Sequence, residues 1–128
     1  LCSRERAQRL IEEHLLNPEE FWGEYLLPFN PVNELAGSAE WIEKRLWAGH
    51  CIWTNFCWML AIGLDEYGYR EEAREITRRV VRMILREGFY EYYDSRTGEG
   101  RRIPDFCWPA LALDMMARFW PEVVEVDT

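Results

Sequence analysis

The sequence predicts an all-α fold in which amphipathic outer helices alternate with apolar inner helices. Segments 3–16 and 70–87 carry apolar residues at three-four spacing with charged residues opposite, as in helices that lie on a core. Segments 51–67 and 109–119 are apolar on nearly all sides and therefore belong inside. The connections that lead into the inner helices are long and aromatic, so the long loops are expected at the N-terminal ends of these helices.

The N-terminal part begins with the amphipathic helix over residues 3–16. Its apolar stripe consists of Ala7, Leu10, Ile11 and Leu15. In the long connection that follows, Asn17 and Pro18 are typical of a capped helical start. Ser38 is expected to cap a short helix whose apolar residues are Trp41, Ile42 and Leu46.

The outer helix over residues 70–87 has the clearest periodicity. Its apolar residues are Ala73, Ile76, Val80, Val81, Ile84 and Leu85, and Gly88 is expected to end it. The opposite face carries glutamates and arginines four residues apart, such as Glu75 and Arg79. This pattern predicts a solvated face with ion pairs, not a binding patch.

Two architectures fit alternating helical layers, a closed double barrel and a compact four-helix bundle. Wholly apolar inner helices favour the barrel, because each helix of a four-helix bundle keeps one wet face. A barrel of six helix pairs needs on the order of 300 to 400 residues. Residues 1–128 are therefore expected to form a single unit that is only part of such a barrel, and the first residue, Leu1, agrees with a longer protein.

Composition excludes several classes of partner. The formal net charge is -8, so binding to nucleic acid or to an anionic membrane would gain no counterion-release energy. The chain has no run of apolar residues long enough to span a bilayer and no signal-peptide core, which predicts a soluble, cytoplasmic protein.

The cysteines and histidines do not form a metal-binding pattern. No pair of them stands at zinc-ligand spacing, so neither a metal nor another cofactor is expected. The cysteines are Cys2, Cys51, Cys57 and Cys107. We expect reduced thiols, and we expect the last three to be buried among bulky apolar neighbours.

The segment 88–100 carries the strongest functional pattern. It places one carboxylate, Glu91, among aromatic rings directly before a glycine-rich turn. Apolar surroundings raise the pKa of carboxyl groups toward the range useful for proton transfer, and flat rings stack on the apolar faces of sugars. The pattern predicts a carbohydrate site, and the alternative is a plain surface carboxylate at the start of a loop.

Three motifs follow one another in the chain. They are Trp47-Ala48-Gly49-His50-Cys51-Ile52-Trp53-Thr54-Asn55, Phe89-Tyr90-Glu91-Tyr92-Tyr93-Asp94 with Thr97-Gly98-Glu99-Gly100, and Phe106-Cys107-Trp108-Pro109-Ala110. Together they resemble consecutive motifs near the end of the catalytic (α/α)6 barrel of inverting glycosidases of the glycoside hydrolase family 63 type. Relatives of this type are mannosylglycerate and glucosylglycerate hydrolases, processing α-glucosidase and, more distantly, trehalase. The resemblance implies the C-terminal part of such a barrel and an oligosaccharide or small glycoside with an α-linkage as substrate.

The resemblance also implies roles for individual residues. Glu91 matches the general base, which activates water opposite an acid about 6.5 to 9.5 Å away. The family's acid is an aspartate upstream of the matching part, so this chain alone is expected to be inactive. Its expected partner is the missing N-terminal part of the barrel or a complementary chain. The implied substrate-binding residues are Trp47, Gly49, Trp53, Asn55, Tyr93, Phe106 and Trp108.

Departures from the family pattern leave a second interpretation open. Ala48 stands where arginine is usual and Cys51 where proline is usual, so the chain is alternatively a non-catalytic helical module for protein interaction or carbohydrate binding. The aromatic candidates are alternatively core residues, because large rings dominate burial. Asn55 alternatively makes structural hydrogen bonds inside an apolar helix.

The remaining polar residues of the motifs are expected to have structural roles. His50 precedes an inner helix whose dipole disfavours protonation, so we expect a neutral side chain. Asp94 and Glu99 are expected in turns. Asp105 is expected to cap the second inner helix.

Overall fold

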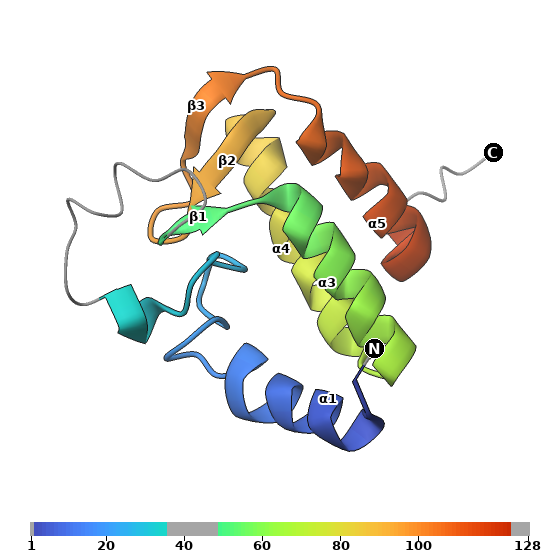
Figure 1. Cartoon of the computed structure of the whole chain (residues 1–128). Coiled ribbons are helices and arrows are strands. Elements are labelled where there is room, and N and C mark those ends of the chain that lie inside the picture. The colour runs from blue at the N-terminus through green and yellow to red at the C-terminus, as the bar shows by residue number, and fades with distance from the viewer. Residues whose placement is uncertain (1, 36–48, 124–128) are drawn as a thin grey trace.

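Three packed helices form the body of the computed structural model, which describes residues 2–35 and 49–123. They are α3 (Thr54–Tyr67), α4 (Arg70–Glu87) and α5 (Leu111–Phe119). α3 and α4 run antiparallel, and α5 packs against both of them (Figure 1). α1 (Arg4–Leu10), which contacts α3, continues into a π-helical turn over Ile11–Leu15.

Glycines end the two long helices. Gly68 has φ +95° and donates its backbone N–H to the Asp65 carbonyl, which closes the last turn of α3. Gly88 has φ +89° and donates to the Ile84 carbonyl at 2.8 Å, so α4 ends where the sequence predicts. Single-turn 3-10 segments cover Val32–Leu35, Trp108–Ala110 and Pro121–Val123.

A small antiparallel sheet corrects the prediction of an all-α fold. Its strands are β1 (Cys51–Ile52), β2 (Tyr90–Asp94) and β3 (Gly100–Pro104), in the order β1-β2-β3. β2 and β3 form a hairpin, because a tyrosine-rich run with high strand propensity is followed by a glycine-containing turn. β1 adds to this hairpin with Cys51 opposite Asp94 and Ile52 opposite Tyr93.

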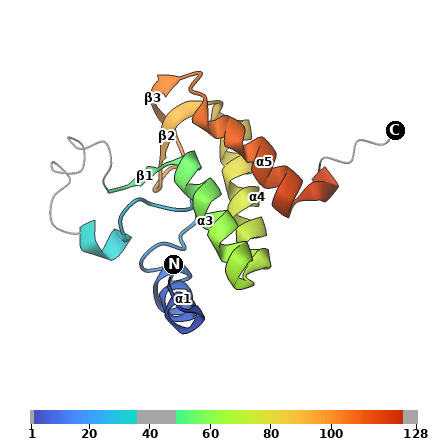
Figure 2. The same ribbon diagram turned by 45° about the vertical axis from the view of Figure 1, so that its right-hand side comes forward.

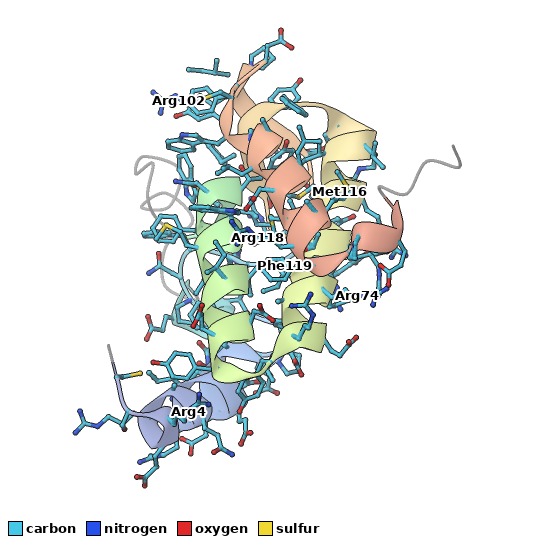
Figure 3. All side chains as sticks on the ribbon, turned by 90° about the vertical axis from the view of Figure 1, so that its right-hand side faces the viewer. Arg4, Arg74, Arg102, Met116, Arg118 and Phe119 are labelled. Carbon is cyan, nitrogen blue, oxygen red and sulfur yellow. The ribbon has the colours of Figure 1, made fainter. Side chains whose placement is uncertain are left out.

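The sheet lies at the N-terminal ends of α3 and α5, as Figures 1 and 2 show from two sides. Figure 3 shows Arg102 of β3 at this end of the molecule and Arg4 of α1 at the opposite end. The predicted placement of the long connections at the N-terminal ends of the inner helices is therefore confirmed for these two helices.

α4 buries one face and exposes the other. Its buried residues are Ala73, Ile76, Thr77, Val80, Val81, Met83 and Ile84. Leu85 is 81% exposed, so the prediction that it belongs to the apolar stripe was wrong. The predicted pair Arg79–Glu75 forms at 2.7 Å. Arg79 also donates to the Gly23 carbonyl and lies over the Trp22 ring, so this part of the charged face is covered by the chain and is not wholly solvated.

The apolar helices α3 and α5 are buried on one side only. Cys57, Ala61 and Leu64 of α3 and Ala112, Met115 and Phe119 of α5 face the core. In contrast, Met59 is 53% exposed and Leu113 is 66% exposed. The two helices therefore have apolar surface that the described residues do not cover.

The N-terminal connection agrees with its prediction only in part. The predicted cap at Asn17 forms, because its side chain accepts the Glu19 N–H at 3.0 Å. No helix follows, and residues 17–22 form a turn in which the Asn17 carbonyl accepts the N–H groups of residues 20–22. The short helix expected after Ser38 lies outside the described residues.

All four cysteines are free thiols, as predicted. Cys51 and Cys57 are buried, but Cys107 is exposed, so its predicted burial was wrong. Cys107 is exposed because it lies in the connection before α5 and not inside an apolar helix. No helix among residues 2–35 and 49–123 is long and apolar enough to cross a bilayer.

Candidate functional site

Glu91 is the second residue of β2 and is largely buried, with 13% of its side chain exposed. Its Oε2 atom makes no hydrogen bond to the described residues. Arg102 is its cationic neighbour among the described residues, with Nε 3.4 Å from Glu91 Oε2, a distance that fits an ion pair and is long for a charged hydrogen bond. Glu91 is therefore a buried carboxylate with one oxygen that accepts no hydrogen bond from the described residues.

A β-bulge directs Arg102 toward Glu91. Tyr90 pairs with Pro104 and Tyr92 pairs with Arg101, so Glu91 alone faces two residues of β3. One of them, Arg102, has φ +71°, in the left-handed region that favours glycine. Bulges of this kind re-aim side chains and are common beside active sites.

Aromatic rings from the three motifs meet beside β2. The Trp53 ring lies 5.1 Å from the Tyr92 ring and 5.5 Å from the Trp108 ring, between centroids. Phe106 meets Trp108 edge to face at 5.0 Å. These distances are typical of favourable aromatic pairs. The sequence motifs, far apart in the chain, thus converge on one aromatic cluster, which we call the Trp53 cluster (Trp53, Tyr92, Phe106 and Trp108).

The members of this cluster differ in exposure. Trp53 is only 1% exposed and forms its base, which is the core position that the sequence left as an alternative. Phe106 and Trp108 are half-buried and present ring surface to the outside. Of the predicted substrate-binding rings, these two have the surface that a sugar needs. Trp47, also predicted to bind substrate, lies outside the described residues.

Tyr93 has the geometry of a structural residue. Its side chain is fully buried, its hydroxyl donates to the Gly88 carbonyl at 2.7 Å, and the same oxygen accepts the Tyr90 N–H at 3.3 Å. Burial raises the pKa of Tyr93 to about 12. This arrangement favours a role in fixing the start of the hairpin over the predicted contact with substrate.

Gly49 is held in a turn before β1. It has φ +67°, its N–H donates to Asn30 Oδ1 at 2.9 Å, and it is buried. Only glycine adopts this backbone conformation without strain. The geometry gives Gly49 a reason to be glycine that does not depend on substrate.

Two oxygens at the start of α3 lack partners among the described residues. They are Thr54 Oγ1 and Asn55 Oδ1, and Thr54 is 1% exposed. No side chain from the described part of the chain caps this helix end. Buried polar atoms normally find a partner, so these two oxygens are exceptions among the described residues. Asn55, predicted to bind substrate or to bond structurally, makes no hydrogen bond through this oxygen to residues 2–35 or 49–123.

His50 borders the hairpin from the other side. Its Nδ1 lies 3.3 Å from Ser95 Oγ, and its carbonyl accepts the Ser95 N–H at 2.7 Å. Burial lowers the pKa of His50, and Arg96 lowers it further against the opposing effect of Asp94. This direction agrees with the predicted neutral state, and burial is its largest cause.

The hairpin turn is organised by Asp94. Its carboxylate accepts from the Arg96 N–H at 2.9 Å and from the Arg96 guanidinium at 2.7 Å. Burial alone raises the pKa of Asp94, but the Arg96 bonds outweigh it, so the pKa lies below its ordinary value. The predicted turn role of Asp94 is confirmed. Glu99 also lies in the turn, where its carbonyl accepts the Asp94 N–H at 3.0 Å.

Asp105 does not cap α5, so that prediction was wrong. The residue before α5 is Ala110, and no side chain of the described residues bonds to the helix start. Asp105 instead has φ +57° and lies in the bend between β3 and the Trp108–Ala110 turn. A 3-10 turn with Pro109 fills the position at which a cap was expected.

Sequence reasoning missed the arginines of β3. Arg101 lies 3.6 Å from Asp94 and Arg102 lies 3.4 Å from Glu91, so each cation of the pair faces a carboxylate of β2. The sequence feature that could have indicated these ion pairs is the Arg101-Arg102 pair directly after the glycine-rich turn. Among the described residues, no group of three His, Cys, Asp or Glu side chains is arranged to hold a metal ion.

The sequence over residues 2–109 matches the family model of the mannosylglycerate hydrolase MGH1-like glycoside hydrolase domain. Mannosylglycerate hydrolase from Thermus thermophilus is 36% identical over 119 residues, which are 90% of this chain and 25% of that protein. Mannosylglycerate hydrolase from Rubrobacter radiotolerans is 44% identical over 73 residues, which are 56% of this chain and 16% of that protein. The chain therefore spans a quarter or less of the length of these relatives.

Solved structures agree with this match. The family 63 mannosylglycerate hydrolase from a second strain of Thermus thermophilus, in complex with glucose, has a TM-score of 0.69 and 32% identity over 91% of this chain and 26% of that chain. The same enzyme in complex with Tris and D-glycerate has a TM-score of 0.69 and 32% identity over 91% of this chain and 27% of that chain. Sequence and structure together show that the chain belongs to the MGH1-like family of glycoside hydrolase domains.

Proposed function

We propose that this chain contributes the general base and aromatic sugar subsites of a glycosidase that inverts configuration at an α-linked sugar. The observation that supports this most directly is the position of Glu91. It is a largely buried carboxylate whose Oε2 accepts no hydrogen bond from the described residues, on a strand whose next residue, Tyr92, belongs to the Trp53 cluster.

The chemistry requires few groups from this chain. In an inverting reaction, a carboxylate accepts a proton from water while the water oxygen attacks the anomeric carbon on the face opposite the leaving group. Glu91 would accept that proton through its carboxylate. The half-buried rings of Phe106 and Trp108 would stack on the apolar face of the sugar.

The acid that protonates the leaving group would come from outside these residues. Because the matched relatives are about four times as long as the chain, we infer that the rest of the barrel supplies it. The proposed substrate is a small α-glycoside of the mannosylglycerate kind, by analogy with the activity for which those relatives are named. The proposed location of the protein is the cytoplasm.

Exposed apolar surface supports this dependence on a further segment. Met59 and Leu60 of α3 line a groove of about 350 Å³ with Leu10 of α1, and Leu113 of α5 is also exposed. Soluble monomers rarely leave such surface uncovered. We propose that the remaining barrel helices, joined to this chain or carried by a separate one, pack on it.

Glu91→Gln in the protein that contains the whole barrel tests the proposed base. The amide is nearly isosteric but cannot accept the proton, so hydrolysis of mannosylglycerate should fall by about 10²- to 10⁴-fold. Glu99→Gln, a change of the same kind in the turn, is the control and should keep its rate. Thermal unfolding of the two variants should match that of the parent protein.

Two further measurements complete the test. Proton NMR of the first product formed should show the anomer inverted relative to the substrate. The chain of 128 residues alone should give no measurable hydrolysis. Unchanged turnover in Glu91→Gln would remove Glu91 from the mechanism and favour the non-catalytic helical module.

A further inference from the structure

The last two residues of α4 hold the tip of the β2–β3 hairpin. Arg86 donates to the Thr97 carbonyl at 2.8 Å, and Glu87 Oε2 accepts the Gly100 N–H at 3.2 Å. Arg86 Nε also donates to Glu87 Oε1 at 2.7 Å, so the two side chains are fixed relative to each other. Consecutive helix residues thus bond to the backbone at two points of the hairpin, in the turn and at the start of β3.

Packing at the turn reinforces these bonds. The Arg86 guanidinium carbon lies 5.3 Å from the centre of the Tyr25 ring, and Arg86 also donates to the Tyr25 hydroxyl at 2.9 Å. Gly98 is buried against both side chains, and a methyl group in place of its hydrogen would collide with the Tyr25 ring and the Arg86 guanidinium. The turn therefore packs tightly against the side chains of Arg86 and Tyr25.

Glu91 lies on the segment between the anchored points. Upstream, the Gly88 carbonyl accepts the Tyr93 hydroxyl, and downstream Thr97 and Gly100 are held by Arg86 and Glu87. An isolated hairpin of two strands is marginally stable, and β1 adds only two residues to this one. The position of Glu91 thus depends on contacts between the hairpin and α4.

We propose that Arg86 and Glu87 are positioning residues that fix the hairpin carrying the general base. The catalytic part of this inference rests on the proposed function, because it takes Glu91 as the base. The attachment of the hairpin to Arg86 and Glu87, which we call the anchor, does not depend on that function. An exposed ion pair contributes little by itself, so the effect comes from the bonds to the backbone of the hairpin. A small displacement of a catalytic group has a large effect on rate, so loosening the hairpin should lower the rate of hydrolysis.

Amide hydrogen exchange in the chain itself tests the anchor. Glu87→Ala removes the acceptor of the Gly100 N–H, so exchange of this amide should accelerate by about tenfold or more, with neighbouring amides of β3 following. Arg86→Met keeps the apolar stem but removes the donors, and it should accelerate exchange in the turn. Glu87→Gln keeps an acceptor oxygen and should recover much of the protection.

Controls separate local loosening from general loss of stability. Arg82→Met changes an exposed arginine one turn earlier on α4 and should leave hairpin exchange unchanged. The amides of Val80 and Val81, in the middle of α4, should keep their rates in every variant. Unchanged hairpin exchange in Glu87→Ala and Arg86→Met, or equal acceleration throughout α4, would overturn the anchor.

Kinetics in the protein that contains the whole barrel test the positioning role. Glu87→Ala should lower kcat by about 10- to 100-fold with little change in KM, and Glu87→Gln should restore most of it. A kcat that stays unchanged while the hairpin loosens would overturn the role in positioning. If Glu91→Gln also leaves turnover intact, the proposed function has failed, and the exchange data still decide the anchor.

Discussion

Arg102 Nε lies 3.4 Å from Glu91 Oε2, and Arg102 reaches this position with φ +71°. A non-glycine residue in the left-handed region is strained by about 1 to 2 kcal/mol. The bulge therefore brings a cation beside the proposed base at a cost in backbone energy. Strain that persists next to a candidate site is typical of functional geometry.

Arg102→Gly and Arg102→Ala should differ in stability. Both variants lose the ion pair with Glu91, but only glycine adopts the left-handed conformation without strain. The free energy of unfolding of Arg102→Gly should exceed that of Arg102→Ala by about 1 kcal/mol, as measured by urea denaturation. Equal values for the two variants would mean that Arg102 is not strained.

Gly98→Ala should destabilise the chain more than Gly68→Ala. Both glycines have positive φ, +70° and +95°, so each substitution has a conformational cost of about 1 to 2 kcal/mol. A methyl group at Gly68 meets open space, whereas one at Gly98 meets Tyr25 and Arg86. The overpacking should add about 1 to 3 kcal/mol at Gly98, measured again by urea denaturation. A smaller effect at Gly98 than at Gly68 would contradict the close packing of the turn against Tyr25 and Arg86.

Asp94 should make the chain sensitive to acid. Its folded-state pKa is below the ordinary value of 3.8, so its ion pair stabilises the fold above that value. This contribution is lost as the pH falls through the lower, folded-state pKa. Asp94→Asn should therefore be less stable than the parent at pH 7 by about 1 kcal/mol. The difference should shrink as the pH approaches 3.

Urea denaturation at a series of pH values measures this effect. Glu66→Gln, a change of an exposed carboxylate in α3, is the control for the loss of one negative charge. A difference between Asp94→Asn and the parent that stays constant from pH 7 to about pH 3 would rule out the ion pair as its source.

Leu113→Ala should report whether further helices pack on α5. In this chain Leu113 is 66% exposed, so the substitution should change the free energy of unfolding by less than about 0.5 kcal/mol. Met115→Ala, at a fully buried position of the same helix, should cost about 2 to 5 kcal/mol. In the protein that contains the whole barrel, the cost of Leu113→Ala should rise to about 2 kcal/mol or more. A cost that stays small there would place Leu113 outside the barrel contacts.

The helices were predictable because their patterns are local. α4 begins at Arg70 and ends at Glu87 as predicted, since its apolar residues recur at helical spacing and a glycine follows. The sheet was not predicted, because a strand as short as Cys51–Ile52 exists only through its partner 43 residues away at Asp94. Pattern reading cannot detect such a pairing.

The candidate site was predicted only in part, because some of its contacts join residues that are distant in the sequence. The motifs pointed to Glu91, Trp53, Phe106 and Trp108, since these residue types suit carbohydrate chemistry, but not to Tyr92. The roles of Tyr93 and Gly49 depend on bonds to Gly88 and Asn30 that only the folded chain reveals. Strand register decides which of the two adjacent arginines, Arg101 or Arg102, faces Glu91, and this register cannot be read from the sequence.

The pairing of β1 with β2 has a consequence for how this domain can evolve. Main-chain hydrogen bonds between these strands are independent of side-chain identity, so they tie the start of α3 to the hairpin whatever residues occupy the surface. Substitutions of exposed side chains around these strands can then accumulate without changing the strand register of Glu91. The surface around the proposed base can therefore change while Glu91 keeps its place in the sheet.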